Sequence, residues 1–327
     1  MIPAASPLRE QLLYRALGAA MLSDFHFRDL QPVPVAPSAD AVTMRIERAE
    51  EPAVPEGELV HSTPDSDAGP RLELWESDRV LTWRVRGVGT FALRADGRHV
   101  HYWLEDNAEH GDAEIMLSGP IMGTAAQLRG EILLHGAALI ANDVAIAISA
   151  PHGFGKSTLI TSFARAGYPM LAEDIVHIRE DGTGLEVAPY VPRIKLLDES
   201  VERFGEDPAE YGRVLSWHPK RTIRPGGTWG AIAEAPVPLR AVYFLEPYVE
   251  HSRDVEIEEI GDVEAVMRLH GSMYHSHSMR GRRTVASLDA ATRVASVVPV
   301  RVVRYVRDFD VLDDLRAAIL QDAERNL

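Results

Sequence analysis

The sequence APHGFGKS at residues 150–157 decides the fold of this 327-residue chain. The apolar run VAIAIS at residues 144–149 precedes it and predicts a buried strand. A short helix is expected over residues 158–166, ended by Gly167 and Pro169. A glycine loop between a strand and a helix lets backbone amides close around an anion, and the helix N-terminus adds partial positive charge. Together the three elements predict a phosphate-binding P-loop.

Two side chains of this loop have specific expected roles. Lys156 is expected to reach the β- and γ-phosphates of a nucleotide, and the hydroxyl of Ser157 is expected to hold Mg²⁺. Ala150 stands where the strict pattern has its first glycine. The alternative is a tight strand-to-helix turn that carries a lysine by chance. The nucleotide-binding set that we predict is Gly153, Phe154, Gly155, Lys156, Ser157 and Thr158.

Lysine is rare in this chain. Among 34 lysines and arginines, the lysines are Lys156, Lys195 and Lys220, and all three lie in the stretch that begins at the P-loop. A lysine retained against such a preference for arginine fits a position that needs a compact point charge. We therefore take Lys195, Lys220 and the neighbouring Arg221 as candidate phosphate or substrate contacts, with ordinary surface charge as the alternative.

The composition limits which binding partners and which cellular compartment are expected. The net charge of −15 disfavours duplex DNA and an anionic membrane as partners. The chain has no cysteine, which excludes disulfides, cysteine-based zinc sites and thiol catalysis. Arg9 and Arg15 interrupt the apolar residues of the N-terminus, and no apolar run approaches the ~18 residues of a membrane span. We expect a cytoplasmic protein without nucleic-acid or membrane partners, and homo-oligomerisation stays open.

Short alternating runs dominate the N-terminal part of the chain. The runs at residues 72–76 and 80–86 predict strands. Residues 90–94 are expected to pair with residues 99–104 across a tight turn. We therefore predict a smaller β-rich N-terminal domain over residues 1–119.

Helical and strand patterns mix in the rest of the chain. A helix is expected over residues 120–129 and a closing helix over residues 311–326. We predict an α/β P-loop domain with a mixed sheet over residues 120–327. Within the N-terminal domain, residues 32–37 and 50–70 are predicted to be exposed, mobile loops, because they are rich in proline or acidic residues.

Glu173 and Asp174 are the candidate carboxylates. They lie in the run at residues 170–178, which predicts the next strand along the chain. A P-loop kinase or ATPase needs a carboxylate that positions Mg²⁺, and a second could accept the proton of a substrate hydroxyl. Strand alternation sends neighbouring side chains to opposite faces, so both reach the phosphates only at a frayed strand end. The spacing does not divide the two roles, and a solvated acidic strand end is the alternative.

Three motifs together resemble the HPr kinase/phosphorylase family. They are LHG at residues 134–136, the loop at residues 150–157 and AED at residues 172–174. That family phosphorylates a serine of a small phosphocarrier protein. The resemblance implies an HPr-kinase-like fold with ATP and Mg²⁺ as cofactors.

The same resemblance implies roles for individual residues. It places His135 near the phosphates, and it makes Glu173 the base and Asp174 the metal partner beside Ser157. With Lys156, these residues complete the predicted catalytic set of Glu173, Asp174, His135 and Lys156.

Softer matches resemble one branch of this family, the HPr-kinase-like proteins encoded with lasso-peptide biosynthesis. They are YRALG at residues 14–18, SDF at 23–25, PRIKL at 192–196 and PLRAVYFL at 238–245. Members of that branch phosphorylate a hydroxyl, typically on a C-terminal serine, of a ribosomal precursor peptide. The resemblance implies a peptide or small protein with a serine hydroxyl as the acceptor.

Two basic segments give weaker signals. Lys220, Arg221 and Arg224 precede a glycine turn and would neutralise phosphoryl charge as a lid, or form a solvated loop. The second segment has no carboxylate in its adjacent sequence, so contact with an anion or plain surface is favoured over a metal site. Its basic residues are His270, His275, His277, Arg280, Arg282 and Arg283.

The sequence therefore predicts an ATP-dependent, Mg²⁺-requiring kinase that transfers the γ-phosphoryl group to a hydroxyl, most plausibly serine of a ribosomal precursor peptide. The alternatives among enzymes are an HPr-type serine kinase/phosphorylase, a small-molecule kinase and a phosphohydrolase. The alternative outside enzymes is a nucleotide-gated binding protein. No Asn-Lys-x-Asp guanine motif and no Leu-Ser-Gly-Gly-Gln transporter signature is present, which disfavours switch and transporter functions.

Overall fold

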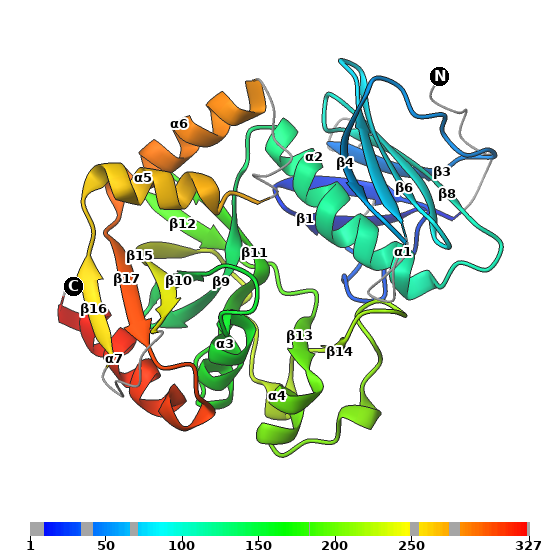
Figure 1. Cartoon of the computed structure of the whole chain (residues 1–327). Coiled ribbons are helices and arrows are strands. Elements are labelled where there is room, and N and C mark those ends of the chain that lie inside the picture. The colour runs from blue at the N-terminus through cyan, green and yellow to red at the C-terminus, as the bar shows by residue number, and fades with distance from the viewer. Residues whose placement is uncertain are drawn as a thin grey trace. The chain divides into compact units, whose positions relative to one another are not determined.

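The chain forms two compact units, coloured along the sequence in Figure 1. The first contains Met1–Glu131 and Gly212–Arg221, and the second contains Ile132–Tyr211 and Thr222–Leu327. The predicted α/β class is confirmed, because helices combine with mixed sheets. The computed structural model describes residues 10–33, 42–65, 71–182, 184–248, 255–274 and 282–325.

The first unit is built on an eight-stranded sheet of order β1-β2-β3-β8-β7-β6-β5-β4. Neighbouring strands are antiparallel, except that β3 runs parallel to β2 and β8. The predicted hairpin is confirmed as β7 paired with β8. The strands are β1 (Leu12–Ala16), β2 (Ala19–Ser23), β3 (Met44–Arg48), β4 (Glu58–Thr63), β5 (Leu72–Glu76), β6 (Val80–Val85), β7 (Gly89–Arg94) and β8 (His99–Leu104).

Strand β4 corrects one prediction. It lies inside residues 50–70, which the sequence analysis assigned to a loop. β4 is the last strand of its sheet and its residues are exposed or half-buried, so it lacks the apolar alternation that marks a strand with one buried face. Residues 34–37 and 66–70 of the predicted loops lie outside the described residues.

A helical segment completes the first unit: α1 (His110–Met116), a π-helical turn (Leu117–Ile121) and α2 (Met122–Leu128). It begins before the predicted start at residue 120, and Pro120 lies in the π-helical turn. Arg129 follows and donates to the carbonyls of Gly97 at 2.7 Å and Leu17 at 2.9 Å. These bonds hold the segment to the first sheet, so the units divide after Glu131 rather than after the predicted residue 119.

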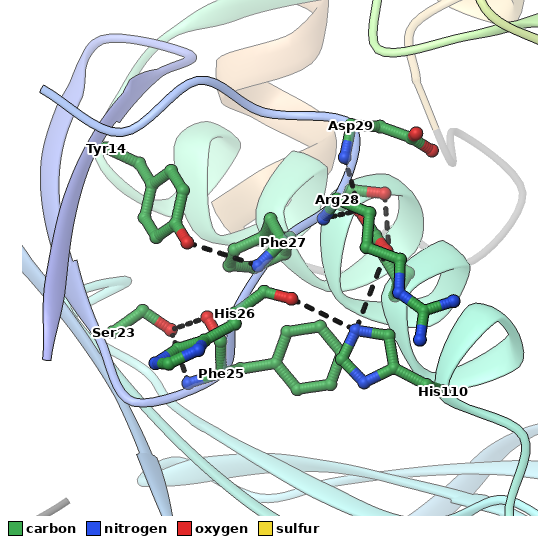
Figure 2. Close-up of polar contacts among 10 residues, drawn as sticks. Tyr14, Ser23, Phe25, His26, Phe27, Arg28, Asp29 and His110 are labelled. Carbon is green, nitrogen blue, oxygen red and sulfur yellow. Dashed lines mark hydrogen bonds and ion pairs between the residues drawn. The ribbon is translucent and has the colours of Figure 1, made fainter. Parts of the chain in front are cut away.

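The buried carboxylate of Glu114 fixes α1 to the loop after β2. Its Oε1 accepts the backbone N–H groups of Arg28 at 2.8 Å and Asp29 at 2.9 Å. Figure 2 shows these amides near the stacked rings of Phe25 and His110, whose centroids lie 4.5 Å apart. Helix and loop are thus joined by both polar and ring contacts.

The second unit is built on a seven-stranded sheet of order β10-β9-β11-β12-β15-β17-β16. β10 also pairs with β15 in parallel, so the strands β10, β9, β11, β12 and β15 close a ring of pairings. The predicted P-loop strand is confirmed as β10. The strands are β9 (Ile132–Ala141), β10 (Val144–Ser149), β11 (Met170–Glu180), β12 (Leu185–Ala188), β15 (Val237–Pro247), β16 (Glu256–Glu259) and β17 (Val300–Tyr305).

Helices cover both faces of this sheet (Figure 1). α3 (Lys156–Arg165) and α7 (Leu312–Arg325) pack in one apolar core, and α5 (Asp262–Gly271) and α6 (Arg282–Val297) pack in the other. Because β10 contributes alternate residues to both cores, its sequence is apolar throughout. The remaining elements are β13 (Ile194–Leu197), α4 (Asp198–Arg203), β14 (Lys220–Ile223) and 3₁₀ turns at Pro208–Glu210, Gly227–Trp229 and Phe309–Val311.

The predicted closing helix is confirmed as α7. None of the helices in the described ranges has both the length and the apolar character that a bilayer crossing requires.

Candidate active site

The P-loop lies between β10 and α3 with the geometry that its glycines permit. Gly153 and Gly155 adopt left-handed φ values of 86° and 81°, and α3 begins at Lys156, two residues before the predicted start. Ala150 is buried in the apolar core and has no left-handed φ, so the missing glycine is tolerated there. Backbone N–H groups of the first turn of α3 are left without a helical acceptor, which suits an anion.

Tyr305, at the end of β17, fixes this loop. Its hydroxyl donates to the carbonyl of Phe154 at 2.5 Å, and a methyl group at Gly155 would lie 3.3 Å from the same hydroxyl. Burial raises the pKa of Tyr305 to about 12, so the phenol keeps its proton. Sequence reasoning missed Tyr305, because it is 151 positions from Phe154 and has no local motif.

Four ionisable side chains form a chain of contacts beside the loop. Lys156 Nζ lies 3.0 Å from His135 Nε2, and His135 Nδ1 lies 3.3 Å from Asp174 Oδ1. Lys195 Nζ donates to Asp174 Oδ2 at 2.7 Å. The four come from α3, β9, β11 and β13, so three predicted catalytic residues and one predicted phosphate contact meet in one cluster.

Burial and neighbouring charge set the protonation of this cluster. Burial, followed by the charge of Lys156, lowers the pKa of His135 to about 4, so its ring is neutral at pH 7. Burial alone would raise the pKa of Asp174. Lys195, His135 and Lys156 together outweigh that effect and hold the Asp174 pKa well below its usual range.

Glu173 contacts the P-loop directly. Its Oε1 accepts the hydroxyl of Ser157 at 2.9 Å, and the residue is 3% exposed. A hydroxyl and a carboxylate so close together fit Mg²⁺, which takes few protein oxygens and shares the rest of its shell with water and phosphates. Within the described ranges, no cluster of three or more metal-ligating residues occurs. The residues present therefore fit the predicted ion, with Glu173 rather than Asp174 beside Ser157.

The backbone of β11 is irregular at Asp174. Asp174 has a φ of 75°, a left-handed value that is uncommon for residues other than glycine, although aspartate adopts it more often than most. The strand end is not frayed, since β11 continues to Glu180, so that condition of the prediction is wrong. Gly136 pairs with Asp174 on β9, and a methyl group there would lie 2.8 Å from the carbonyl of Ile148. The glycine of the LHG motif thus permits the close approach of β10.

Two more residues near the cluster had no signal in the sequence. Tyr274 lies with its ring 6.3 Å from that of His135, and its backbone N–H donates to Leu133. Burial raises the Tyr274 pKa well above its usual value, and the charge of Asp174 adds to that effect. Ser200 Oγ lies 3.2 Å from Thr158 Oγ1, which links α4 to the predicted nucleotide-binding set.

Other predicted residues lie outside this cluster. Lys220 and Arg221 belong to the first unit, and the second unit forms the cluster from its own residues. His270 on α5 lies 3.0 Å from Ser287 Oγ on α6. His275, His277 and Arg280 lie outside the described residues, as does the side chain of Arg282.

Comparison with known proteins gives distant similarities. No family model matches the sequence. The chain is similar to the tRNA modification GTPase MnmE of Rhodopseudomonas palustris (strain HaA2), with 28% identity over 169 residues. That match covers 47% of this chain and 33% of the relative, so the chain spans about a third of the relative's length.

Among solved structures, the chain is similar to the Hpr(Ser) kinase/phosphatase from Coxiella burnetii. The identity is 12%, the match covers 59% of this chain and 95% of that chain, and the TM-score is 0.31. The lasso-peptide branch stays a prediction from the sequence motifs.

Proposed function

We propose that this protein is an ATP-dependent kinase that transfers the γ-phosphoryl group to a serine hydroxyl of a peptide. The observation that carries the proposal is the P-loop with Lys156 and Ser157 next to two carboxylates in distinct surroundings. The similarity to a GTPase supports nucleotide binding. The choice of ATP, the serine acceptor and the cytoplasmic location rest on the resemblance of the motifs to HPr-kinase-like proteins.

Phosphoryl transfer depends mainly on positioning and on stabilising charge. Lys156 and the first amides of α3 would bind the β- and γ-phosphates. Mg²⁺, held by Ser157 and Glu173, would neutralise phosphate charge. The acceptor oxygen forms its bond to the γ-phosphorus as the bond to the β-phosphate oxygen breaks. ADP leaves, and the hydroxyl proton passes to a carboxylate.

Asp174 is our candidate for that carboxylate. The family resemblance implies Glu173 as base and Asp174 as metal partner, but the contacts favour the exchanged roles. Glu173 is bonded to the P-loop serine and almost wholly buried, whereas the Asp174 side chain is 25% exposed. An acceptor hydroxyl needs that access.

A pair of peptides tests the function. Purified protein is incubated with Mg-ATP and a peptide that ends in serine, and mass spectrometry follows addition of one phosphate. The matched control peptide ends in alanine. Phosphate on the serine peptide alone is the expected result.

Three other outcomes would replace the proposal. Phosphate found on a small alcohol or sugar, and not on the peptide, indicates a small-molecule kinase. Nucleotide hydrolysis that no acceptor changes indicates a hydrolase or a nucleotide-gated switch. A preference for GTP over ATP in a binding titration would indicate GTP, rather than ATP, as the phosphoryl donor.

A further inference from the structure

The contacts between Lys195 and Lys156 run through two intermediate side chains. Lys195 lies on β13, Asp174 on β11, His135 on β9 and Lys156 at the start of α3. Each contact joins a different pair of elements, at 2.7, 3.3 and 3.0 Å. Asp174 and His135 thus connect the two lysines.

The chemistry of lysine fixes the direction of each hydrogen bond. An ammonium group donates and cannot accept. His135 Nε2 must therefore accept from Lys156, which places the proton of the neutral ring on Nδ1. Nδ1 lies 3.3 Å from Asp174 Oδ1, while Lys195 donates to Oδ2 at 2.7 Å.

The geometry points to Lys195 and His135 as positioning residues that hold Asp174 and Lys156 in one fixed relation. The inference rests on the proposed function, in which Lys156 binds phosphate and Asp174 faces the acceptor. His135 accepts from Lys156 and thereby orients the ammonium group that would bind phosphate oxygens. This series of contacts would therefore set the distance between Lys156 and Asp174 before the nucleotide or the acceptor binds.

Lys195 has a second consequence for Lys156. Asp174 is a half-buried carboxylate with a left-handed backbone, and such a conformation persists only when its surroundings hold it in place. Without Lys195, the other lysine of the cluster becomes the remaining cation for Asp174. A direct Asp174–Lys156 pair would occupy the lysine that the phosphates need. Lys195 keeps Lys156 available by pairing with Asp174 itself.

This function for Lys195 differs from the direct phosphate contact that the sequence suggested. A direct contact would act independently of His135. A positioning chain acts as one unit, and the effects of removing its members are not additive.

A double-mutant cycle distinguishes a direct phosphate contact of Lys195 from a positioning function. Lys195→Met and His135→Gln are each expected to lower kcat about 10- to 100-fold and to leave the KM for ATP within about threefold. The double variant should be no slower than the worse single variant. Lys195→Arg should recover part of the rate, and Arg293→Met on α6 is the control for loss of a cation from an exposed ion pair. Multiplying effects, or a rise in KM without a fall in kcat, would overturn the inference.

Nitrogen NMR of the His135 ring gives a readout that does not require turnover. In the wild-type protein, the ring should be neutral and protonated on Nδ1, with the signal assigned by its loss in His135→Gln. In Lys195→Met, the same signal should move, because the partner of Nδ1 has lost its own anchor. A ring protonated on Nε2 in the wild type, or a signal that Lys195→Met leaves unchanged, contradicts the chain.

The two measurements separate this inference from the proposed function. If the wild-type protein transfers no phosphate, the function fails, while the ring tautomer still tests the chain. Thermal unfolding of each variant shows whether it is folded, and Lys195→Arg replaces Lys195→Met if the latter is not.

Discussion

Two carboxylates, one in each unit, are held in opposite ways. Glu114 of the first unit is 2% exposed and accepts two backbone N–H groups, and it lies within a regular helix. Asp174 of the second unit is held by the side chains of Lys195 and His135 and has a left-handed φ of 75°. The Glu114 carboxylate accepts hydrogen bonds from backbone amides, whereas the Asp174 carboxylate contacts ionisable side chains.

The difference separates a structural site from a functional one. The hydrogen bonds to Glu114 help to join α1 to the loop after β2. They also offset the free-energy cost of burying the Glu114 carboxylate and the two amides. Around Asp174, a left-handed backbone and shifted pKa values occur together, and such features cluster at sites of chemistry. Substitutions in the two regions should therefore change different quantities.

The largest effect is expected for Lys156→Met. Loss of the ammonium should slow phosphoryl transfer by on the order of 10³-fold or more, because a charge that stabilises the transferring group is removed. The free energy of unfolding should change little. Turnover and urea unfolding are the two measurements. A Lys156→Met protein with wild-type turnover would remove the basis for calling this region functional.

Glu173→Gln and Asp174→Asn should each reduce transfer by about 10²- to 10³-fold, but for different reasons. Glu173→Gln should raise the Mg²⁺ concentration needed for half-maximal rate, since it alters the oxygen beside Ser157. Asp174→Asn should leave that concentration unchanged and lower kcat. Separate titrations of Mg²⁺ and ATP measure both. The reverse pattern would restore the roles that the family resemblance implies.

Glu114→Ala should destabilise the protein by about 2–4 kcal/mol, because the amides of Arg28 and Asp29 lose a buried acceptor. Glu114→Gln is the matched control, since it keeps one acceptor oxygen, and it should cost less. Nucleotide affinity should be unchanged in both. Urea unfolding and a nucleotide titration give the two readouts. Weaker nucleotide binding in a folded Glu114→Ala protein would mean that the first unit also serves the site.

Acid should destabilise the second region through His135. Its pKa is about 4 when folded and about 6.5 when unfolded, so the unfolded chain takes up the proton first. Stability is therefore lost as pH falls from about 6.5 toward 4. The effect is limited because the side chain is 38% exposed. Unfolding temperatures between pH 4 and 8 should fall less steeply in His135→Gln. Parallel curves for the two proteins would show that His135 is not buried in its neutral form.

The P-loop was predictable because its signal is local. Glycines at positions 153 and 155, a preceding apolar strand and a following helix gave β10 and α3 almost to the residue. The hairpin of β7 and β8 was predictable for the same reason. Each is specified by its own turn residues and apolar pattern.

The arrangement of the carboxylates was not predictable, because it depends on residues far apart in the sequence. Strand alternation places Glu173 and Asp174 on opposite faces, and only the left-handed φ of Asp174 changes that. The pairing of Lys195 with Asp174 spans 21 positions and is set by the packing of β13 near β11. The rarity of lysine singled out Lys195, and the structure shows that Asp174 is one of its partners.

The smallest effect is expected for Tyr305→Phe. This change removes only the hydroxyl that donates to the carbonyl of Phe154, and one such bond contributes about 1 kcal/mol. The P-loop would lose one restraint, so nucleotide affinity should weaken about three- to fivefold, while kcat at saturating ATP stays near that of the wild type. Because Tyr305 packs in the same apolar core as α3, the ring of phenylalanine keeps that packing. Tyr168→Phe is the control, because Tyr168 also packs against this core. An equal loss of affinity in both variants would assign the effect to general stability. A loss confined to Tyr305→Phe would show that the phosphate loop, unlike the Glu114 region, depends on a single contact from a distant strand.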